Sequence, residues 1–126
     1  MVFLLVDGDD VGGRLERHLL QNNVAAFVAT SNAIDFAIRS LVLVAEEIDG
    51  VRAISIGGDS VLFEAAEESV EALSAALASS QNVGGFSFSV GVGPSLRECY
   101  LGLRMAKTSG KGKIVRFSED GGACQG

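Results

Sequence analysis

Tryptophan is absent from the chain, and tyrosine, proline and histidine each occur once among its 126 residues. The scarcity of Trp and Tyr argues against a surface that stacks on the bases of a single strand. The two cysteines, Cys99 and Cys124, are too few for a disulfide framework, and no CxxC or Cys/His cluster suggests zinc. One Pro beside 16 Gly favours regular elements joined by tight turns.

Positive charge is also in short supply, because 10 Lys and Arg face 16 Asp and Glu, for a net charge of −6. Such a molecule repels a duplex or a long single strand, whereas Mg²⁺ can bridge acidic residues to a small polyanion. The most apolar later run, residues 41–45, is far shorter than the roughly 20 residues of a membrane span. The N-terminus has no basic lead and no cleavage site. We therefore expect a cytoplasmic protein with no duplex nucleic acid and no membrane as partner.

Apolar periodicity predicts the element order β-α-α-β-β-α-β-α-β. Strands are expected over residues 2–6, 51–56, 61–63, 86–92 and 113–117, and helices over 12–22, 24–48, 67–80 and 95–108. The fold class is α+β, since the core β-α-β-β-α-β is the ferredoxin-like arrangement, an antiparallel sheet with helices packed on one face. A helix and a strand extend this core at its C-terminal end. We expect one domain over residues 1–117 and a flexible tail over 118–126.

Two acidic turns are expected to meet in this topology. Asp7 closes the first strand, and Asp59 lies at the tip of the hairpin that follows the long helix. Because the first strand and the hairpin are neighbours in the sheet, both carboxylates reach the same edge, where like charges favour a bound cation. Mg²⁺ or Mn²⁺ is the expected cofactor, with the carbonyl of Gly8 as a further oxygen ligand.

The glycines of the hairpin suggest what such a metal site would serve. Gly57 and Gly58 allow the hairpin backbone to approach a nucleotide closely. Two metal ions about 4 Å apart would activate an attacking hydroxyl and neutralise a leaving pyrophosphate. Asp7 and Asp59 are therefore the predicted catalytic residues. Taken alone, a Gly-Gly pair between alternating apolar residues is an ordinary hairpin turn.

Three segments carry a family resemblance. The first reads VDGDDVGGRLE and is similar to the DGDxxG motif of the palm polymerase subunit in type III CRISPR complexes. The second, ISIGGDSVLF, is similar to the GGDD hairpin of that subunit and to the GGDEF hairpin of diguanylate cyclases. The third, SVGVG followed by a helix and AKTSGKGKIV, resembles the end of both. The similarity spans residues 2–117 and is greatest to the minimal CRISPR polymerase family (mCpol).

The resemblance implies a palm fold and an enzyme that condenses nucleoside triphosphates, usually ATP, into cyclic oligonucleotides for antiviral defence. A downstream effector would bind the product rather than this chain. Where the relatives place a second acidic residue after GGD, this chain has Ser60, a weaker metal ligand than a carboxylate. Asp7, Gly8, Asp59 and Ser60 are thus the predicted metal-binding residues, with one metal held more loosely.

Other residues are candidates for the nucleotide. Backbone amides of Asp9, Asp10, Val11 and Gly12 open the first helix and are suited to phosphate. Asp9 or Asp10 would also compensate for Ser60, or else be solvated loop residues or helix N-terminal charges.

Two lysines near the C-terminal end complete the candidates. Lys107 takes the place where the relatives put a lysine on the triphosphate, or simply favours a helix C-terminus. Lys111, in a glycine-rich turn, adds charge to a phosphate site or is merely solvated.

Three other readings remain open. A diguanylate cyclase is the nearest, although the full GGDEF motif is absent. A catalytically degenerate nucleotide sensor would explain Ser60, and a receiver domain would use Asp59 as a phospho-acceptor, but the chain has no Lys-Pro after a fifth strand. Because ring closure needs two nucleotides, we expect a homodimer or a higher even-numbered assembly, with Arg14 and the loop near Asn22 as contact candidates.

Overall fold

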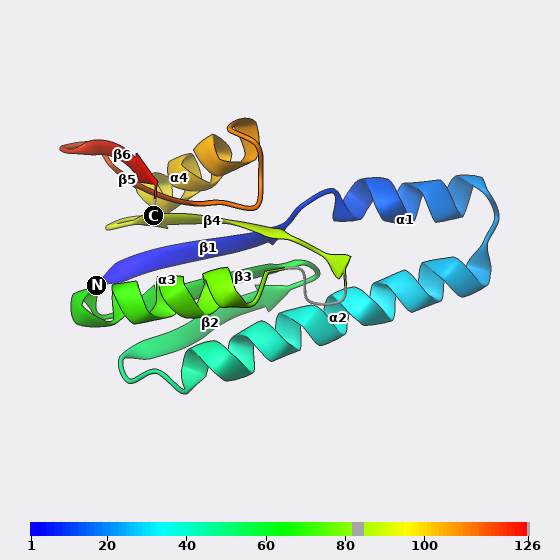
Figure 1. The fold of residues 1–126 in the computed structure, drawn as a ribbon, viewed down its shortest axis with the longest axis horizontal. Coiled ribbons are helices and arrows are strands. Elements are labelled where there is room, and N and C mark those ends of the chain that lie inside the picture. Colours follow the sequence, from blue (N-terminus) through cyan, green and yellow to red (C-terminus); the bar gives the residue numbers. More distant parts are fainter. Residues whose placement is uncertain (82–84, 126) are drawn as a thin grey trace.

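The computed structural model describes residues 1–81 and 85–125 and has one six-stranded sheet with helices on both faces (Figure 1). The strands are β1 (Val2–Gly8), β2 (Val51–Gly57), β3 (Ser60–Ala65), β4 (Phe88–Gly93), β5 (Ile114–Ser118) and β6 (Gly122–Gln125). The helices are α1 (Val11–Leu20), α2 (Val24–Glu46), α3 (Val70–Ser79) and α4 (Leu96–Thr108), with a short 3-10 turn η1 (Glu67–Ser69) before α3.

The sheet has the strand order β2-β3-β1-β4-β5-β6, and only the β4–β5 pair is parallel among the described strands. This confirms the α+β palm-like fold and places β1 directly beside β3, the second strand of the hairpin. The expected free tail is wrong for Gly122–Gln125, which form β6 and pair with β5.

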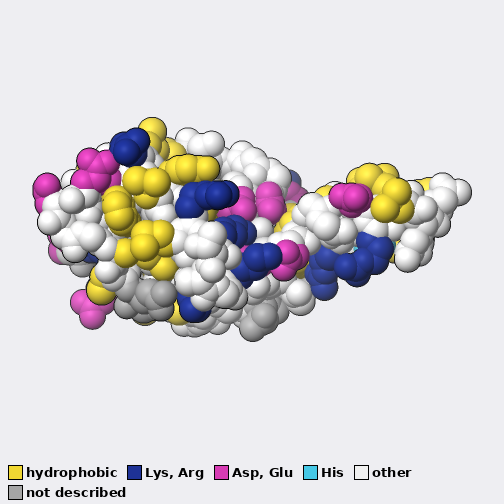
Figure 2. Space-filling view, turned by 90° about the horizontal axis from the view of Figure 1, so that it is seen from above, with side chains coloured by type: hydrophobic (Ala, Val, Ile, Leu, Met, Phe, Trp, Pro, Cys, Tyr) yellow, Lys and Arg dark blue, Asp and Glu magenta, His cyan; other side chains and the backbone are white. Residues whose placement is uncertain are grey.

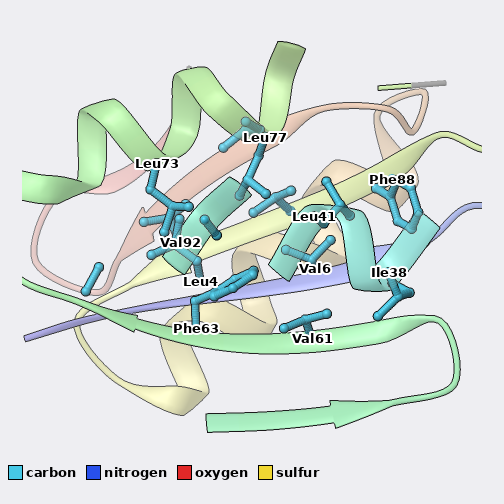
Figure 3. Packing of buried hydrophobic residues seen from close by; sticks show 14 of the residues in the cluster. Leu4, Val6, Ile38, Leu41, Val61, Phe63, Leu73, Leu77, Phe88 and Val92 are labelled. Atoms are coloured by element: carbon cyan, nitrogen blue, oxygen red, sulfur yellow. The ribbon is translucent and has the colours of Figure 1, made fainter. Parts of the chain in front are cut away.

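The core lies between the sheet and the two helices α2 and α3. Alternate residues of β1 point into it, since Val2, Leu4 and Val6 are at most 3% exposed and side chains alternate along a strand. Figure 3 shows how the labelled side chains of α2 and α3 pack against those of β1, β3 and β4. Burial of this apolar cluster is the main force that holds the sheet to these helices.

The fourth helix, α4, covers the opposite face, so the helices are not all on one side as a bare ferredoxin-like core would have them. It packs against β4, β5 and β1, and the approach is backbone to backbone. A side chain at Gly91 would place its Cβ 1.9 Å from the carbonyl oxygen of Cys99, and one at Gly102 would come 2.7 Å from that of Val115. Neither position accepts another residue without moving the helix.

Helix ends follow the local sequence. Ser95 caps α4, because its hydroxyl accepts from the amide of Glu98 at 3.1 Å and donates to the Glu98 carboxylate at 2.8 Å. Asn23 caps α2 by accepting from the amide of Ala26 at 3.0 Å. These caps fix where the chain enters each helix.

Helix α1 and the first half of α2 form a helical arm that projects past the end of the sheet (Figure 1). Among the described residues, α2 is the one helix long and apolar enough to cross a membrane by length and composition alone. The core helices of globular proteins satisfy the same criterion, and α2 turns Ile34, Ala37, Ile38, Leu41 and Ala45 toward the core. The apolar run seen at 41–45 is therefore part of a longer apolar helix.

Candidate nucleotide site

Asp7 and Asp59 meet at one end of the sheet, as the element order predicts. Asp7 lies opposite Ser60 in the β1–β3 pair, next to the hairpin tip. The amide of Gly8 donates to the carbonyl oxygen of Asp59 at 2.9 Å. Gly58 turns the hairpin with φ +57°, a backbone angle that glycine adopts without strain. The two acidic turns are thus joined through the backbone.

Gly8 lies where no side chain fits. A Cβ there would stand 2.7 Å from the Val11 side chain and 3.1 Å from Oδ2 of Asp59. The backbone of Gly8 and the carboxylate of Asp59 are therefore in close contact. The two glycines of the β2–β3 hairpin, Gly57 and Gly58, are exposed, which leaves this side open to a ligand.

Asp59 is costly to ionise where it lies. Burial raises the pKa of Asp59 above its ordinary value, and the nearby charge of Asp7 raises it further. Among the residues that the structure describes, no group of three or more His, Cys, Asp and Glu side chains is placed to hold a metal. Two carboxylates and a backbone carbonyl are nevertheless hard oxygen donors of the kind that Mg²⁺ takes together with substrate phosphates. The residues present fit Mg²⁺ or Mn²⁺ on these terms.

Ser60 acts here as a donor. Its hydroxyl donates to Oδ1 of Asp7 at 2.5 Å. The hydroxyl therefore lies within reach of the same carboxylate that is predicted to hold a metal. In this arrangement it orients Asp7.

Lys107 reaches the site from the last turn of α4. Its ammonium lies 3.1 Å from Oδ2 of Asp7, 2.8 Å from the carbonyl oxygen of Gly8 and 2.8 Å from Oδ1 of Asp9. Burial lowers its pKa, but the hydrogen bonds and charges of Asp9 and Asp7 outweigh this, so the pKa is raised and the side chain is a cation. The lysine predicted to face a triphosphate thus lies against the β1–α1 turn, with contacts beyond the terminus of its own helix.

Asp9 corrects the sequence-based expectation of a solvated loop residue. Its side chain is 3% exposed and accepts from the hydroxyls of Ser87 at 2.7 Å and Ser89 at 2.6 Å, and from the amide of Gly112 at 2.9 Å. Burial raises its pKa, yet the hydrogen bonds from Lys107, Ser89 and Ser87 outweigh it, so the pKa lies below the ordinary value. The carboxylate points inward, where it is fully engaged by donors of the chain.

The amides predicted to bind phosphate at the N-terminus of α1 differ in their hydrogen bonds. The amide of Asp9 donates to the carbonyl oxygen of Ser87 at 2.9 Å, so it is not available to phosphate, which leaves residues 10–12. Asp10 has φ 58°, and its exposed carboxylate pairs with Lys111 at 2.5 Å. The side chain of Lys111, which follows α4, therefore lies against the β1–α1 turn, beside the amides predicted to bind phosphate.

An open depression adjoins the acidic pair on the face that carries α4. Its lining residues come from β1, β3 and α4 and are Leu5, Asp7, Ser60, Tyr100, Leu103, Arg104 and Lys107. Figure 2 looks onto this side of the molecule and shows basic side chains next to acidic ones in its middle, with the helical arm projecting to the right. Arg104 and Tyr100 were missed as site residues. Arg104 precedes Lys107 by three positions, a spacing that puts both on one face of a helix.

The profile of the minimal CRISPR polymerase domain, mCpol, matches residues 3–117. The chain belongs to this family. That domain is a palm domain related to those of GGDEF cyclases, and the match covers all the elements that carry the site residues named above. No curated protein sequence matches the chain.

Solved structures with the mCpol-like fold are similar over nearly the whole chain at low identity. A structure described as the Csm1–Csm4 cassette in complex with one ATP superposes with a TM-score of 0.70 at 14% identity, over 90% of this chain and 20% of that one. A diguanylate cyclase/phosphodiesterase from Caldicellulosiruptor saccharolyticus gives 0.68 at 18%, over 92% and 74%. The GGDEF domain of DgcB from Caulobacter crescentus, in complex with c-di-GMP, gives 0.64 at 12%, over 91% and 68%. This mCpol chain thus spans a fifth of the Csm1–Csm4 chain that it matches.

Proposed function

We propose that this mCpol protein is a nucleotidyltransferase that condenses nucleoside triphosphates, with ATP as the first choice, into a cyclic di- or oligonucleotide that signals antiviral defence. The observation that carries the proposal is the meeting of Asp7 and Asp59 at an open edge of a palm-like sheet, next to the ammonium of Lys107. The triphosphate substrate is a cytosolic metabolite, and we expect the protein in the cytoplasm.

The reaction would join two nucleotides without any other reactant. The oxygen of a ribose hydroxyl on one nucleotide attacks the α-phosphorus of the other, the bond to the β-phosphate oxygen breaks, and pyrophosphate leaves with its electron pair. The hydroxyl proton passes to solvent. A second attack of the same kind closes the ring.

Each residue of the site has a task in this scheme. Asp7, Asp59 and the carbonyl of Gly8 would hold Mg²⁺ or Mn²⁺, with the Ser60 hydroxyl orienting Asp7. When bound, the metal neutralises phosphate charge and lowers the pKa of the attacking hydroxyl. Lys107 would face the triphosphate.

The surroundings would complete the phosphate site. Arg104 lines the same depression as Lys107 and would add a second positive charge. The amides of residues 10–12, at the N-terminus of α1, would bind phosphate oxygens. Lys111, beside Asp10, would add charge next to them. These donors would offset the negative charge of the one triphosphate bound at this edge.

The ligands of proteins with the same fold favour ATP as the substrate. Structures with the same fold, described as the Csm1–Csm4 cassette, contain ATP, pppApA and pppApApA. A second candidate product is cyclic di-GMP, since a GGDEF domain of the same fold is described in complex with it. Ser60 replaces the second acid of both the GGDD and the GGDEF hairpin, so the product assay rather than this residue separates the two candidates. A sensor without catalysis would keep nucleotide binding and release no pyrophosphate.

We further propose that the working form is a homodimer or a higher even-numbered assembly. The site is a shallow edge that holds one nucleotide, and two such edges related by a two-fold axis would present two nucleotides to each other. Arg14 already stacks on the ring of Phe86 within its own chain, 4.5 Å from the ring centroid, so it is a weaker contact candidate than the exposed arm tip near Asn22.

Incubation with each nucleoside triphosphate and Mg²⁺, followed by mass spectrometry of the products, tests the proposal. We expect a condensed cyclic product from ATP together with pyrophosphate. An absence of both with all four triphosphates contradicts the enzymatic function. Labelling of Asp59 by acetyl phosphate would instead support a receiver-type phospho-acceptor, and cyclic di-GMP from GTP alone would support the diguanylate cyclase.

A further inference from the structure

Asp9 accepts more hydrogen bonds from the chain than Asp7 or Asp59, the other acidic side chains of the site. Its Oδ1 accepts from Ser89 and Lys107, and its Oδ2 accepts from Ser87 and from the amide of Gly112. These donors come from the chain before β4, from β4, from α4 and from the α4–β5 turn. A buried carboxylate with this many donors stays ionised and fixed in direction.

The ammonium of Lys107 lies between two sets of oxygens. On one side are the carboxylate of Asp7 and the carbonyl of Gly8, the groups proposed to hold the metal. On the other side is Oδ1 of Asp9 at 2.8 Å. A divalent cation on Asp7 and Gly8 repels an ammonium bound to the same oxygens, so only the contact with Asp9 is compatible with both cations.

We propose that Asp9 is a positioning residue of the nucleotide site, which holds the ammonium of Lys107 at the phosphate-binding edge through the one contact that a metal ion does not share. The inference rests on the proposed function. It gives Asp9 a role through Lys107, without contact to metal or nucleotide. It also separates Asp9 from Asp7 and Asp59, which would hold the metal directly.

If the role of Asp9 were purely structural, its effect on nucleotide affinity would not depend on Lys107. Through Gly112, Asp9 also ties the β1–α1 turn to the α4–β5 turn, and loss of that tie alone would destabilise the fold. Such a loss would act on nucleotide affinity independently of Lys107. Energetic coupling between the two side chains therefore distinguishes positioning from structure.

The experiment is a double-mutant cycle on nucleotide binding. The affinity of ATP with Ca²⁺, which takes oxygen ligands as Mg²⁺ does, is measured by titration calorimetry for the wild type, Asp9→Asn, Lys107→Met and the double variant. Each single change is expected to weaken binding about tenfold, the size expected for a charge-assisted hydrogen bond. The double variant is expected to bind no more than about twofold more weakly than Lys107→Met. Additive losses, about a hundredfold in the double variant, would overturn the proposal, as would wild-type affinity in Asp9→Asn.

A second measurement does not depend on nucleotide. If Asp9 pairs with Lys107, Asp9→Asn leaves Asp7 as the remaining carboxylate partner of the ammonium, and the double variant is expected to lose less thermal stability than the sum of the two single losses. Hydrogen exchange of the Gly112 amide is expected to quicken in Asp9→Asn. Additive losses of stability in the double variant contradict the pairing. If Asp9→Asn alone does not fold, the same comparison is made with Asp9→Glu, which keeps the charge. If the wild type binds no ATP while the stability cycle shows coupling, the proposed function fails and the pairing stands.

The matched control is Asp35→Asn on α2. Asp35 forms an exposed pair with Arg39, four residues on along the helix, so the same chemical change is made far from the site. Its nucleotide affinity and Gly112 exchange are expected to equal those of the wild type. A change as large as that of Asp9→Asn would mean that the effect of Asp9 is one of overall charge, and would overturn the proposal.

Discussion

The two acidic turns of this mCpol site differ in how their surroundings affect a partly buried carboxylate. In the β1–α1 turn, donors from the chain surround Asp9 and hold its pKa below the ordinary value. At the β2–β3 hairpin tip, burial and the charge of Asp7 hold the pKa of Asp59 above it. One carboxylate is stabilised by the fold, and the other is left in need of a cation from outside. The difference is between two carboxylates: Asp9 is engaged by donors of the chain, whereas Asp59 is the one proposed to act on a bound metal.

The sharpest test of this comparison is Asp59→Ala. The turnover of nucleotide is expected to fall on the order of 10³-fold, the effect of losing a group that acts on charge in the transition state. The fold is expected to persist, because the carbonyl of Asp59, rather than its side chain, accepts from Gly8. Product formation by mass spectrometry and circular dichroism measure the two properties. Full activity in this variant would remove Asp59 from the site.

The same substitution at both turns should affect stability in opposite directions. In the presence of EDTA, Asp9→Asn is expected to lower the free energy of unfolding by about 3–5 kcal/mol, since it breaks a buried pair. Asp59→Asn is expected to leave it unchanged or raise it, because it removes repulsion with Asp7. Urea unfolding followed by fluorescence or circular dichroism measures both. Equal losses at the two positions would erase the distinction between the turns.

The pH dependence should separate the turns as well. A lowered pKa means that Asp9 stabilises the fold fully above its unfolded value of 3.8 and loses this contribution as the pH falls below that value. The raised pKa of Asp59 means a penalty that is present at neutral pH and disappears as the pH falls through its folded pKa. The deficit of Asp9→Asn is therefore expected to shrink in acid. Unfolding curves at several pH values, without metal, measure the change, and a deficit that grows in acid contradicts the sign.

Ser60→Asp tests the hairpin side alone. A second carboxylate in place of the hydroxyl removes the donor to Asp7 and adds like charge, so the variant is expected to be less stable without metal. With Mn²⁺ present it gains a ligand, and metal affinity is expected to increase about tenfold, in line with the effects of changes around a metal site. Thermal shift against Mn²⁺ concentration measures this. Unchanged affinity would mean that position 60 lies outside the metal's reach.

The smallest effect is expected at the exposed pair of Asp10 and Lys111, which bridges the same two turns as Asp9. The side chains are 71% and 42% exposed, and exposed ion pairs contribute roughly 0–1 kcal/mol. Lys111→Gln is therefore expected to change the free energy of unfolding by less than about 0.5 kcal/mol. A loss comparable to that of Asp9→Asn, in the same urea experiment, would show that the contribution of Asp9 to the free energy of unfolding comes from its charge and not from its burial.

The sequence was sufficient for the meeting of Asp7 and Asp59, because strand alternation and one glycine hairpin determine which strands are neighbours and which ends coincide. It was insufficient for Asp9, which shares a run of acidic letters with Asp10. The two differ in the structure because Asp10 takes φ 58° and its neighbour turns inward to Ser87 and Ser89, partners far along the chain. Local pattern carries no information about such distant donors.

The position of α4 shows a second limit. Periodicity predicted the helix but left open the face of the sheet that it covers. Gly91 and Gly102 mark the face that α4 covers, because the backbones of helix and strand come into contact at these two positions. Strand β6 was missed for another reason. Its polar, glycine-rich residues lack the alternation of a buried strand, and it pairs only with β5 at the sheet edge.

The helical arm has a consequence for how the molecule moves through solution. A body with a projecting arm experiences more frictional drag than a sphere of equal mass, so a single copy should diffuse slowly and elute early from a sizing column. Rotational correlation should likewise be anisotropic, with slower tumbling of the long axis that runs along the arm (Figure 1). A count of subunits from elution volume alone would therefore come out too high for this shape, whereas light scattering, which reads mass directly, separates one copy from two.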